Sequence, residues 1–150
     1  ISISKDGKNF MNSRDFFYEF GRLLYLIDGF YDEFAKKSGV KPNLLWLLYA
    51  LNDGKEHSQC EICQTWASPR STINTITTEL KEAGIIQLKQ IKGKRRELSV
   101  SLTEKGKKYA DGLLKNLYGI EQDTFESVRS DAVTMVNCLQ NIVKCLDAHK

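Results

Sequence analysis

One segment, residues 68–84, constrains the fold most strongly, because it predicts a single amphipathic helix with clear ends. Ser68 is suited to capping the free N–H groups of the first turn, and Pro69 is suited to the first helical position because it lacks an N–H group. Gly84 is expected to end the helix. Apolar residues three and four positions apart predict the buried stripe, which consists of Ile73, Ile76, Leu80 and Ala83.

The opposite face of this predicted helix carries short hydrogen-bonding side chains. Thr is a mediocre helix former, and a face that only meets water more often carries Glu, Lys and Gln. Asn and Arg match the edges of adenine and guanine in the major groove. An ordinary solvated helix is the plainer alternative, but we expect contact with bases or phosphates through Ser68, Arg70, Ser71, Thr72, Asn74, Thr75 and Thr78.

The flanking segments complete a winged helix-turn-helix. Ser58-Gln59-Cys60-Glu61 has the form of a capping box, which predicts a short helix that ends by Trp66-Ala67, one tight turn before residue 68. After Gly84 the apolar period changes from helical to alternating, which predicts strands near 86–88 and 98–102. The turn between them is basic and is expected to meet phosphates or the minor groove, unless it is only a solvated charged turn. Its cations are Lys92, Lys94, Arg95 and Arg96.

Long helices with wide apolar stripes are predicted at both ends of the chain, at 13–37 and 104–150. A chain of 150 residues with 41% apolar content fits one domain, and it has too little other apolar surface to cover both stripes. We therefore expect one domain, residues 1–150, with a winged-helix lobe at about 41–103 and dimerisation helices on either side. The fold class is mainly α (α+β), and the expected assembly is a homodimer.

Positive charge is concentrated in the middle of the chain. The net charge of the whole chain is only +3, whereas residues 68–96 contain seven basic and two acidic side chains. Such a local surplus favours a polyanionic partner such as double-stranded DNA. The sequence has no run of 18 apolar residues and no secretory pattern, so we expect a cytoplasmic protein that does not enter a membrane.

The chain resembles the multiple antibiotic resistance regulator (MarR) family of bacterial transcription factors, from about Ser13 onward. The resemblance rests on Ser-Thr-Ile in the predicted recognition helix, on residues 80–86, and most specifically on Arg95-Arg96 followed by residues 100–106. It implies a winged-helix regulator that binds DNA as a dimer. Members of the family commonly have an acidic residue before the paired arginines, whereas this chain has Lys94, which implies a more purely electrostatic wing.

The resemblance also implies a pocket for a small aromatic or amphipathic effector. The aromatic candidates for its lining are Tyr25, Trp46, Tyr49 and Trp66, although packing in the core is the plainer interpretation of these residues.

Cys60 and Cys63 form a lone C-x-x-C motif at the start of a predicted helix. A structural metal site would need two more ligands, and His57 is the only candidate nearby, so no metal is expected. A redox switch is an alternative, because a helix N-terminus lowers the pKa of a thiol. The sequence has two His, no Gly-rich phosphate loop and no paired carboxylates at a defined spacing, so neither an enzyme nor a cofactor is expected.

These patterns together predict a sequence-specific transcriptional regulator that binds a pseudo-palindromic operator as a homodimer. The resemblance implies a repressor that a small molecule releases. Two alternatives remain open. One is a thiol redox sensor that uses Cys60 and Cys63, and the other is a winged-helix module that binds protein and no DNA.

The basic wing generates a first prediction. Arg95→Ala and Arg96→Ala should each weaken binding to all DNA sequences alike and lower the salt slope by about one unit or less, because one phosphate contact and its released counterion are lost. Titrations at several salt concentrations measure the slope. A change in sequence preference with an unchanged slope would mean that the wing reads bases.

Overall fold

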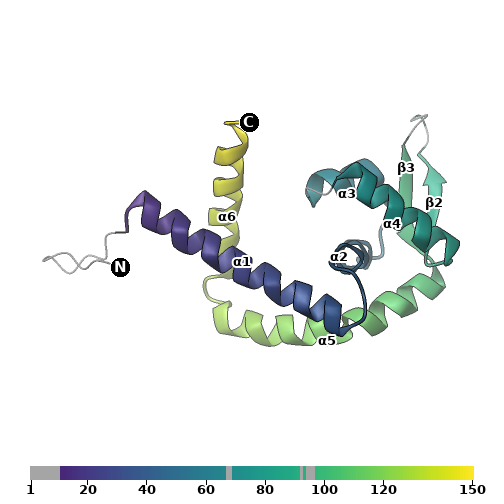
Figure 1. Cartoon of the computed structure of the whole chain (residues 1–150), viewed down its shortest axis with the longest axis horizontal. Helices are drawn as coiled ribbons and strands as arrows, with labels where there is room; N and C mark the ends of the chain where they lie inside the picture. The colour runs from purple at the N-terminus through teal and green to yellow at the C-terminus, as the bar shows by residue number, and fades with distance from the viewer. Residues whose placement is uncertain (1–10, 67–68, 92, 94–96) are drawn as a thin grey trace, which may run out of the picture. The chain divides into compact units, whose positions relative to one another are not determined.

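The computed structural model describes residues 11–66, 69–91, 93 and 97–150 (Figure 1). Five of the predicted DNA-contacting residues lie outside the described part: Ser68, Lys92, Lys94, Arg95 and Arg96. The chain divides into two compact units, one that ends at Ala110 and one that runs from Asp111 to Lys150. None of the described helices is long and apolar enough to span a bilayer.

Two helices open the first unit, and the first has the predicted bounds. Helix α1 (Ser13–Lys37) begins after Asn12, whose side chain accepts a hydrogen bond from the Asp15 N–H at 2.9 Å. Helix α2 (Pro42–Leu51) is apolar on nearly every side, which is typical of a helix buried in a core. It contacts α1, α4 and strand β3, and its buried side chains are Leu45, Leu47, Leu48 and Leu51.

Helix α3 (Gln59–Thr65) confirms the predicted capping box. The Ser58 hydroxyl accepts from the Glu61 N–H at 3.0 Å, and the Glu61 carboxylate accepts from the Ser58 N–H at 3.4 Å. The helix ends at Trp66. A short connection then leads to helix α4 (Arg70–Glu82), so the two form the predicted helix-turn-helix.

The start of α4 differs from the prediction by one residue. Pro69 is the N-cap, with a ψ of 136° that places it outside the helix, and no side chain caps this end. The proline still precedes the first helical turn, where its missing N–H group costs nothing.

The buried stripe of α4 also differs at two positions. Ile73 and Leu80 are buried as predicted and Ile76 is half-buried, but Ala83 is exposed, since the helix ends before it and it forms the C-cap. Thr77 is buried in the stripe, with 1% of its surface exposed. The spacing of apolar residues did not predict that Thr77 is buried, because threonine carries a hydroxyl group and is not counted as apolar.

Three strands form an antiparallel sheet in the order β1-β3-β2. Strands β2 (Ile86–Gln90) and β3 (Leu98–Leu102) pair from Ile86 opposite Leu102 to Gln90 opposite Leu98, as the predicted hairpin requires. Strand β1 (His57–Ser58) pairs with β3 and was not predicted, because two residues are too few to show an alternating pattern. The sheet thus joins the start of α3 to the hairpin.

Helix α5 (Glu104–Val128) begins in close contact with the segment that follows α4. Thr103 caps this helix, since its hydroxyl accepts from the Gly106 N–H at 3.0 Å and donates to the Gly84 carbonyl at 2.7 Å. A Cβ on Gly106 would lie 1.8 Å from the Ile85 carbonyl oxygen. Only glycine therefore fits where the helix crosses the backbone at Ile85.

The second unit contains the rest of α5 and helix α6 (Ala132–Asp147), which Asp131 precedes as predicted. Leu114 and Leu117 of α5 are fully buried. No residue of α6 is buried, although the helix has a broad apolar face. Its exposed apolar side chains are Val133, Met135, Val136, Leu139, Val143 and Leu146.

Gly106→Ala should lower the free energy of unfolding by about 1 to 3 kcal/mol, because the added methyl group would force the Ile85 backbone to move. Gly112→Ala in the same helix is the matched control. Nothing lies within 4 Å of a Cβ at Gly112, so this change should stabilise the helix by about 0.5 to 1 kcal/mol. Chemical denaturation of both variants measures the difference, and equal effects would contradict the close approach.

Candidate nucleic-acid interface and aromatic pocket

The outer face of α4 is exposed along its whole length, as the sequence predicted. Arg70, Ser71, Asn74, Thr75 and Thr78 are all exposed. The side chains of Arg70, Ser71 and Asn74 form no hydrogen bond with another residue that the structure describes. Their donors and acceptors are therefore available to an external partner.

Two threonines of this face use their hydroxyl protons inside the helix. The Thr75 hydroxyl donates to the Ser71 carbonyl at 3.0 Å, and the Thr78 hydroxyl donates to the Asn74 carbonyl at 2.8 Å. What they offer outward is an oxygen lone pair and a methyl group, which suits a phosphate oxygen poorly, because that oxygen is itself an acceptor, and suits a thymine methyl group well. Among the described residues of this face, the side-chain donors that are not used inside the helix belong to Arg70, Ser71 and Asn74.

Thr72 lies at the edge of the outer face. It is half-buried, and together with Thr75 it lines a groove of about 480 Å³ beside residues 39–44. The groove separates the exposed face of α4 from the start of α2. A contact from Thr72 to DNA therefore remains a prediction at the rim of the interface.

A hydrogen bond between the two helices fixes the orientation of α4. The Gln59 amide donates to the Thr77 hydroxyl at 3.0 Å, and that hydroxyl donates to the Ile73 carbonyl at 2.8 Å. Thr77 thus satisfies its buried oxygen while it ties α4 to the first turn of α3. The spacing of apolar residues gives no signal for either Gln59 or Thr77, so the sequence did not indicate this contact.

The strands that lead to the wing carry an ion pair. The Lys89 ammonium lies 2.6 Å from a Glu56 carboxylate oxygen, and the Ser99 hydroxyl donates to the other oxygen at 3.2 Å. The hydrogen bond from Lys89 holds the pKa of the Glu56 carboxyl below its usual value. Glu56 therefore offsets the charge of Lys89, and the basic character of the wing rests on the four cations outside the described residues.

Aromatic side chains cluster where α1, α2 and α3 meet. The Trp46 ring lies 5.3 Å from the Trp66 ring and 5.7 Å from the Tyr49 ring, measured between centroids. The Tyr31 ring lies 4.7 Å from Trp46 and belongs to the same cluster, although it was not predicted. The structure thus brings three of the four predicted pocket residues together.

Tyr25, the fourth predicted pocket residue, lies elsewhere. Its side chain is 81% exposed, and it borders a separate hollow of about 500 Å³ on α1. Trp46 and Tyr31 border the same hollow. Tyr25 therefore lines a second hollow that shares Asp28 and Trp46 with the pocket beside the aromatic cluster, and its role in binding an effector stays a prediction.

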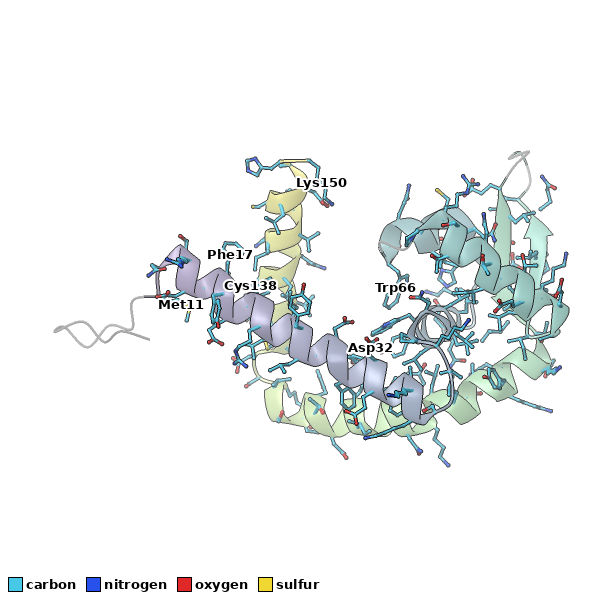
Figure 2. The ribbon with its side chains drawn as sticks, in the orientation of Figure 1. Met11, Phe17, Asp32, Trp66, Cys138 and Lys150 are labelled. Carbon is cyan, nitrogen blue, oxygen red and sulfur yellow. The ribbon has the colours of Figure 1, made fainter. Side chains whose placement is uncertain are left out.

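A pocket of about 380 Å³ lies beside the aromatic cluster. Helix α1 contributes Asp28 and Asp32, α2 contributes Pro42, Asn43, Trp46 and Leu47, α3 and its end contribute Ile62 and Trp66, and α4 contributes Ile73. In Figure 2, Asp32 projects from α1 and Trp66 from the end of α3, and both lie toward α2. The pocket thus touches both helices of the helix-turn-helix.

Cys60, Cys63 and His57 were the candidates for a metal or redox site. Cys60 is exposed, Cys63 is half-buried and both are free thiols. The His57 Nε2 atom lies 2.9 Å from Asp53, a contact that lowers the pKa of the Asp53 carboxyl. Within the described ranges, no three His, Cys, Asp or Glu side chains are grouped to hold a metal ion. A redox role for Cys60 and Cys63 stays a prediction.

The fold of this chain is similar to that of several solved structures. No protein-family profile and no curated protein sequence matches the chain. Among solved structures, NMB1585, a MarR family regulator from Neisseria meningitidis, is 24% identical, with a TM-score of 0.74 over 93% of this chain and 100% of that one.

Two ligand-bound structures are also similar. NadR in complex with 4-hydroxyphenylacetate is 13% identical, with a TM-score of 0.72 over 91% of this chain and 96% of that one. Staphylococcus aureus MarR in complex with salicylate and kanamycin is 16% identical, with a TM-score of 0.69 over 92% and 94%. The helix order, the three-stranded sheet and the hairpin of this chain are those of the winged-helix fold of the MarR family of transcriptional regulators.

Proposed function

We propose that the chain is a DNA-binding transcriptional regulator of the MarR family, a homodimeric repressor whose affinity for its operator falls when a small molecule occupies the aromatic pocket. The single observation that carries the proposal is the outer face of α4. Arg70 and Asn74 are exposed there with no internal partner in the described part of the chain, on a helix anchored by Ile73, Thr77 and Leu80.

The physical case for DNA rests on geometry and charge. The major groove admits one α-helix, and a helix that buries one side in the protein can offer only the other side to the bases. The surplus of cations in residues 68–96 supplies the attraction to phosphates that does not depend on sequence. A module that binds only protein would have little use for both features at adjacent places.

The apolar faces of α1 and α6 support the homodimer. Each of these helices exposes several large apolar side chains, among them Leu26 and Ile27 on α1, which are 60% and 57% exposed. Exposed apolar surface of this extent marks an interaction site in most proteins. Two-fold pairing would bring two copies of α4 onto the two halves of a pseudo-palindrome.

The pocket supports an effector. Known relatives by fold bind 4-hydroxyphenylacetate, salicylate and kanamycin, according to their structures. In this chain the pocket includes Ile62 of α3 and Ile73 of α4, so a ligand in it would contact the two helices that position the DNA-reading face. A ligand that binds the DNA-free arrangement better would weaken DNA binding by the same factor. The thiol-based alternative rests on Cys60, which is exposed and free at the first turn of α3.

Asn74→Ala tests the DNA-reading face. The amide can donate to and accept from adenine at once, so its loss should lower affinity for an operator selected from random DNA by about 5- to 150-fold. Affinity for scrambled DNA should hardly change. The measurement is a pair of titrations at one fixed salt concentration.

Asn141→Ala on α6 is the matched control, because Asn141 is equally exposed and lies far along the chain from the helix-turn-helix. It should leave both titrations unchanged. Equal losses for Asn74→Ala on both DNAs would mean that Asn74 holds a phosphate. No loss on either DNA would contradict a DNA-reading role for this face.

Leu139→Glu tests the dimer. Leu139 lies in the middle of the apolar face of α6, so a buried charge there should convert a dimer into a monomer at micromolar concentration. Asn137→Glu adds the same charge to the polar face of α6 and should leave the dimer intact. Analytical ultracentrifugation distinguishes the two states, and a stable monomer for the unmodified chain would refute the proposed assembly.

A further inference from the structure

Helix α1 carries five carboxylates, which differ in whether they have hydrogen-bond or ion-pair partners among the described residues. Three have partners: Asp15 bonds to Asn12, Glu19 to Arg22 and Glu33 to Lys37. Asp28 and Asp32 have no hydrogen bond or ion pair with any residue that the structure describes, and Asp32 forms no ion pair with Lys36 one turn later. These two carboxylates are also the ones that line the aromatic pocket.

The spacing of Asp28 and Asp32 makes their two negative charges repel each other when the pocket holds no cation. Asp28 and Asp32 are four residues apart, so they are neighbours on one face of the helix, where like charges repel. Both carboxylates are exposed at the edge of the pocket, so water screens part of this repulsion. A positive charge in the pocket would remove this repulsion.

The other wall of the pocket consists of indole rings. Trp46 and Trp66 both line it, with ring centroids 5.3 Å apart and an angle of 35° between the planes. The negative face of an indole attracts a cation more strongly than any other aromatic side chain does, and aromatic walls are the common way to bind quaternary ammonium groups. Carboxylates and indoles therefore favour the same sign of ligand charge.

We propose that this pocket binds an organic cation with an apolar body, such as an aromatic or alkyl ammonium compound. In calling that cation an effector, the inference rests on the proposed function; the charge of the ligand follows from the pocket alone. An aromatic acid of the same size would place its carboxylate beside Asp28 and Asp32, and repulsion would exclude it. A bare metal ion would find two carboxylates with no third His, Cys, Asp or Glu grouped with them among the described residues.

The pocket also accommodates an organic ligand by its size and position. Its volume of about 380 Å³ lies in the range that small-molecule sites occupy. Ile62 and Ile73 close the side that faces the helix-turn-helix. A cation held between α1 and these residues would be linked to the position of α4.

The test uses a pair of probes that share a body and differ in charge, benzyltrimethylammonium and benzylsulfonate. Trp46 and Trp66 are the only two tryptophans of the chain, so tryptophan fluorescence of the DNA-free protein reports on this pocket. We expect the cation to bind at least about tenfold more tightly than the anion. Equal affinities, tighter binding of the anion, or no binding of the cation would each overturn the proposal.

Variants place the effect at the two carboxylates. The double variant Asp28→Asn/Asp32→Asn should lose most of the preference for the cation, which is about tenfold. Its thermal unfolding temperature without ligand should be at least as high as that of the unmodified chain, because a repulsion between two charges is removed. Glu33→Gln is the matched control, because it removes the same kind of charge from α1 outside the pocket. A preference that survives in the double variant would overturn the proposal.

A second titration separates this inference from the proposed function. Saturating benzyltrimethylammonium should weaken operator binding by the unmodified chain and leave operator binding by the double variant unchanged. A chain that prefers the cation through Asp28 and Asp32 but never binds DNA would contradict the proposed function and support the pocket. A chain that binds its operator but shows no preference for the cation would support the proposed function and contradict the proposal for the pocket.

Discussion

The hydrogen bond from Gln59 to Thr77 sets the direction in which α4 faces. Burial of Ile73 and Leu80 would hold the helix against the core, but apolar contacts alone allow a helix to rotate by small amounts at little cost. A polar contact at 3.0 Å allows much less, because a buried hydroxyl without its donor is costly. The contact between the first turn of α3 and the middle of α4 therefore helps to hold outward the face that burial of Ile73 and Leu80 selects.

Much of the architecture followed from local chemistry that acts over three or four residues. The Ser58 capping box was predicted correctly, since it is a short-range pattern with a definite physical cause. The change of apolar period after Gly84 located the hairpin for the same reason. The exposed face of α4 followed from the helical period once its ends were known.

The features that escaped prediction depend on residues far apart in sequence. Strand β1 exists only because Val100 lies opposite His57, and the Glu56–Lys89 pair joins positions 33 residues apart. Asp28 and Asp32 looked like ordinary members of a charged helix face until the fold placed Trp46 and Trp66 across from them. Tyr25 lines a second hollow that shares Trp46 with the first pocket, and an effector role for it stays a prediction.

Helix α6 has a consequence for how long the protein survives in a cell. It has 16 residues and none is buried, and an isolated helix of about this length is marginal in water. In the proposed homodimer the partner would cover its apolar face, so the folding of α6 would be coupled to association and would depend on protein concentration. A cell that makes few copies would leave this helix frayed and open to proteases. The number of copies would then influence the lifetime of each one.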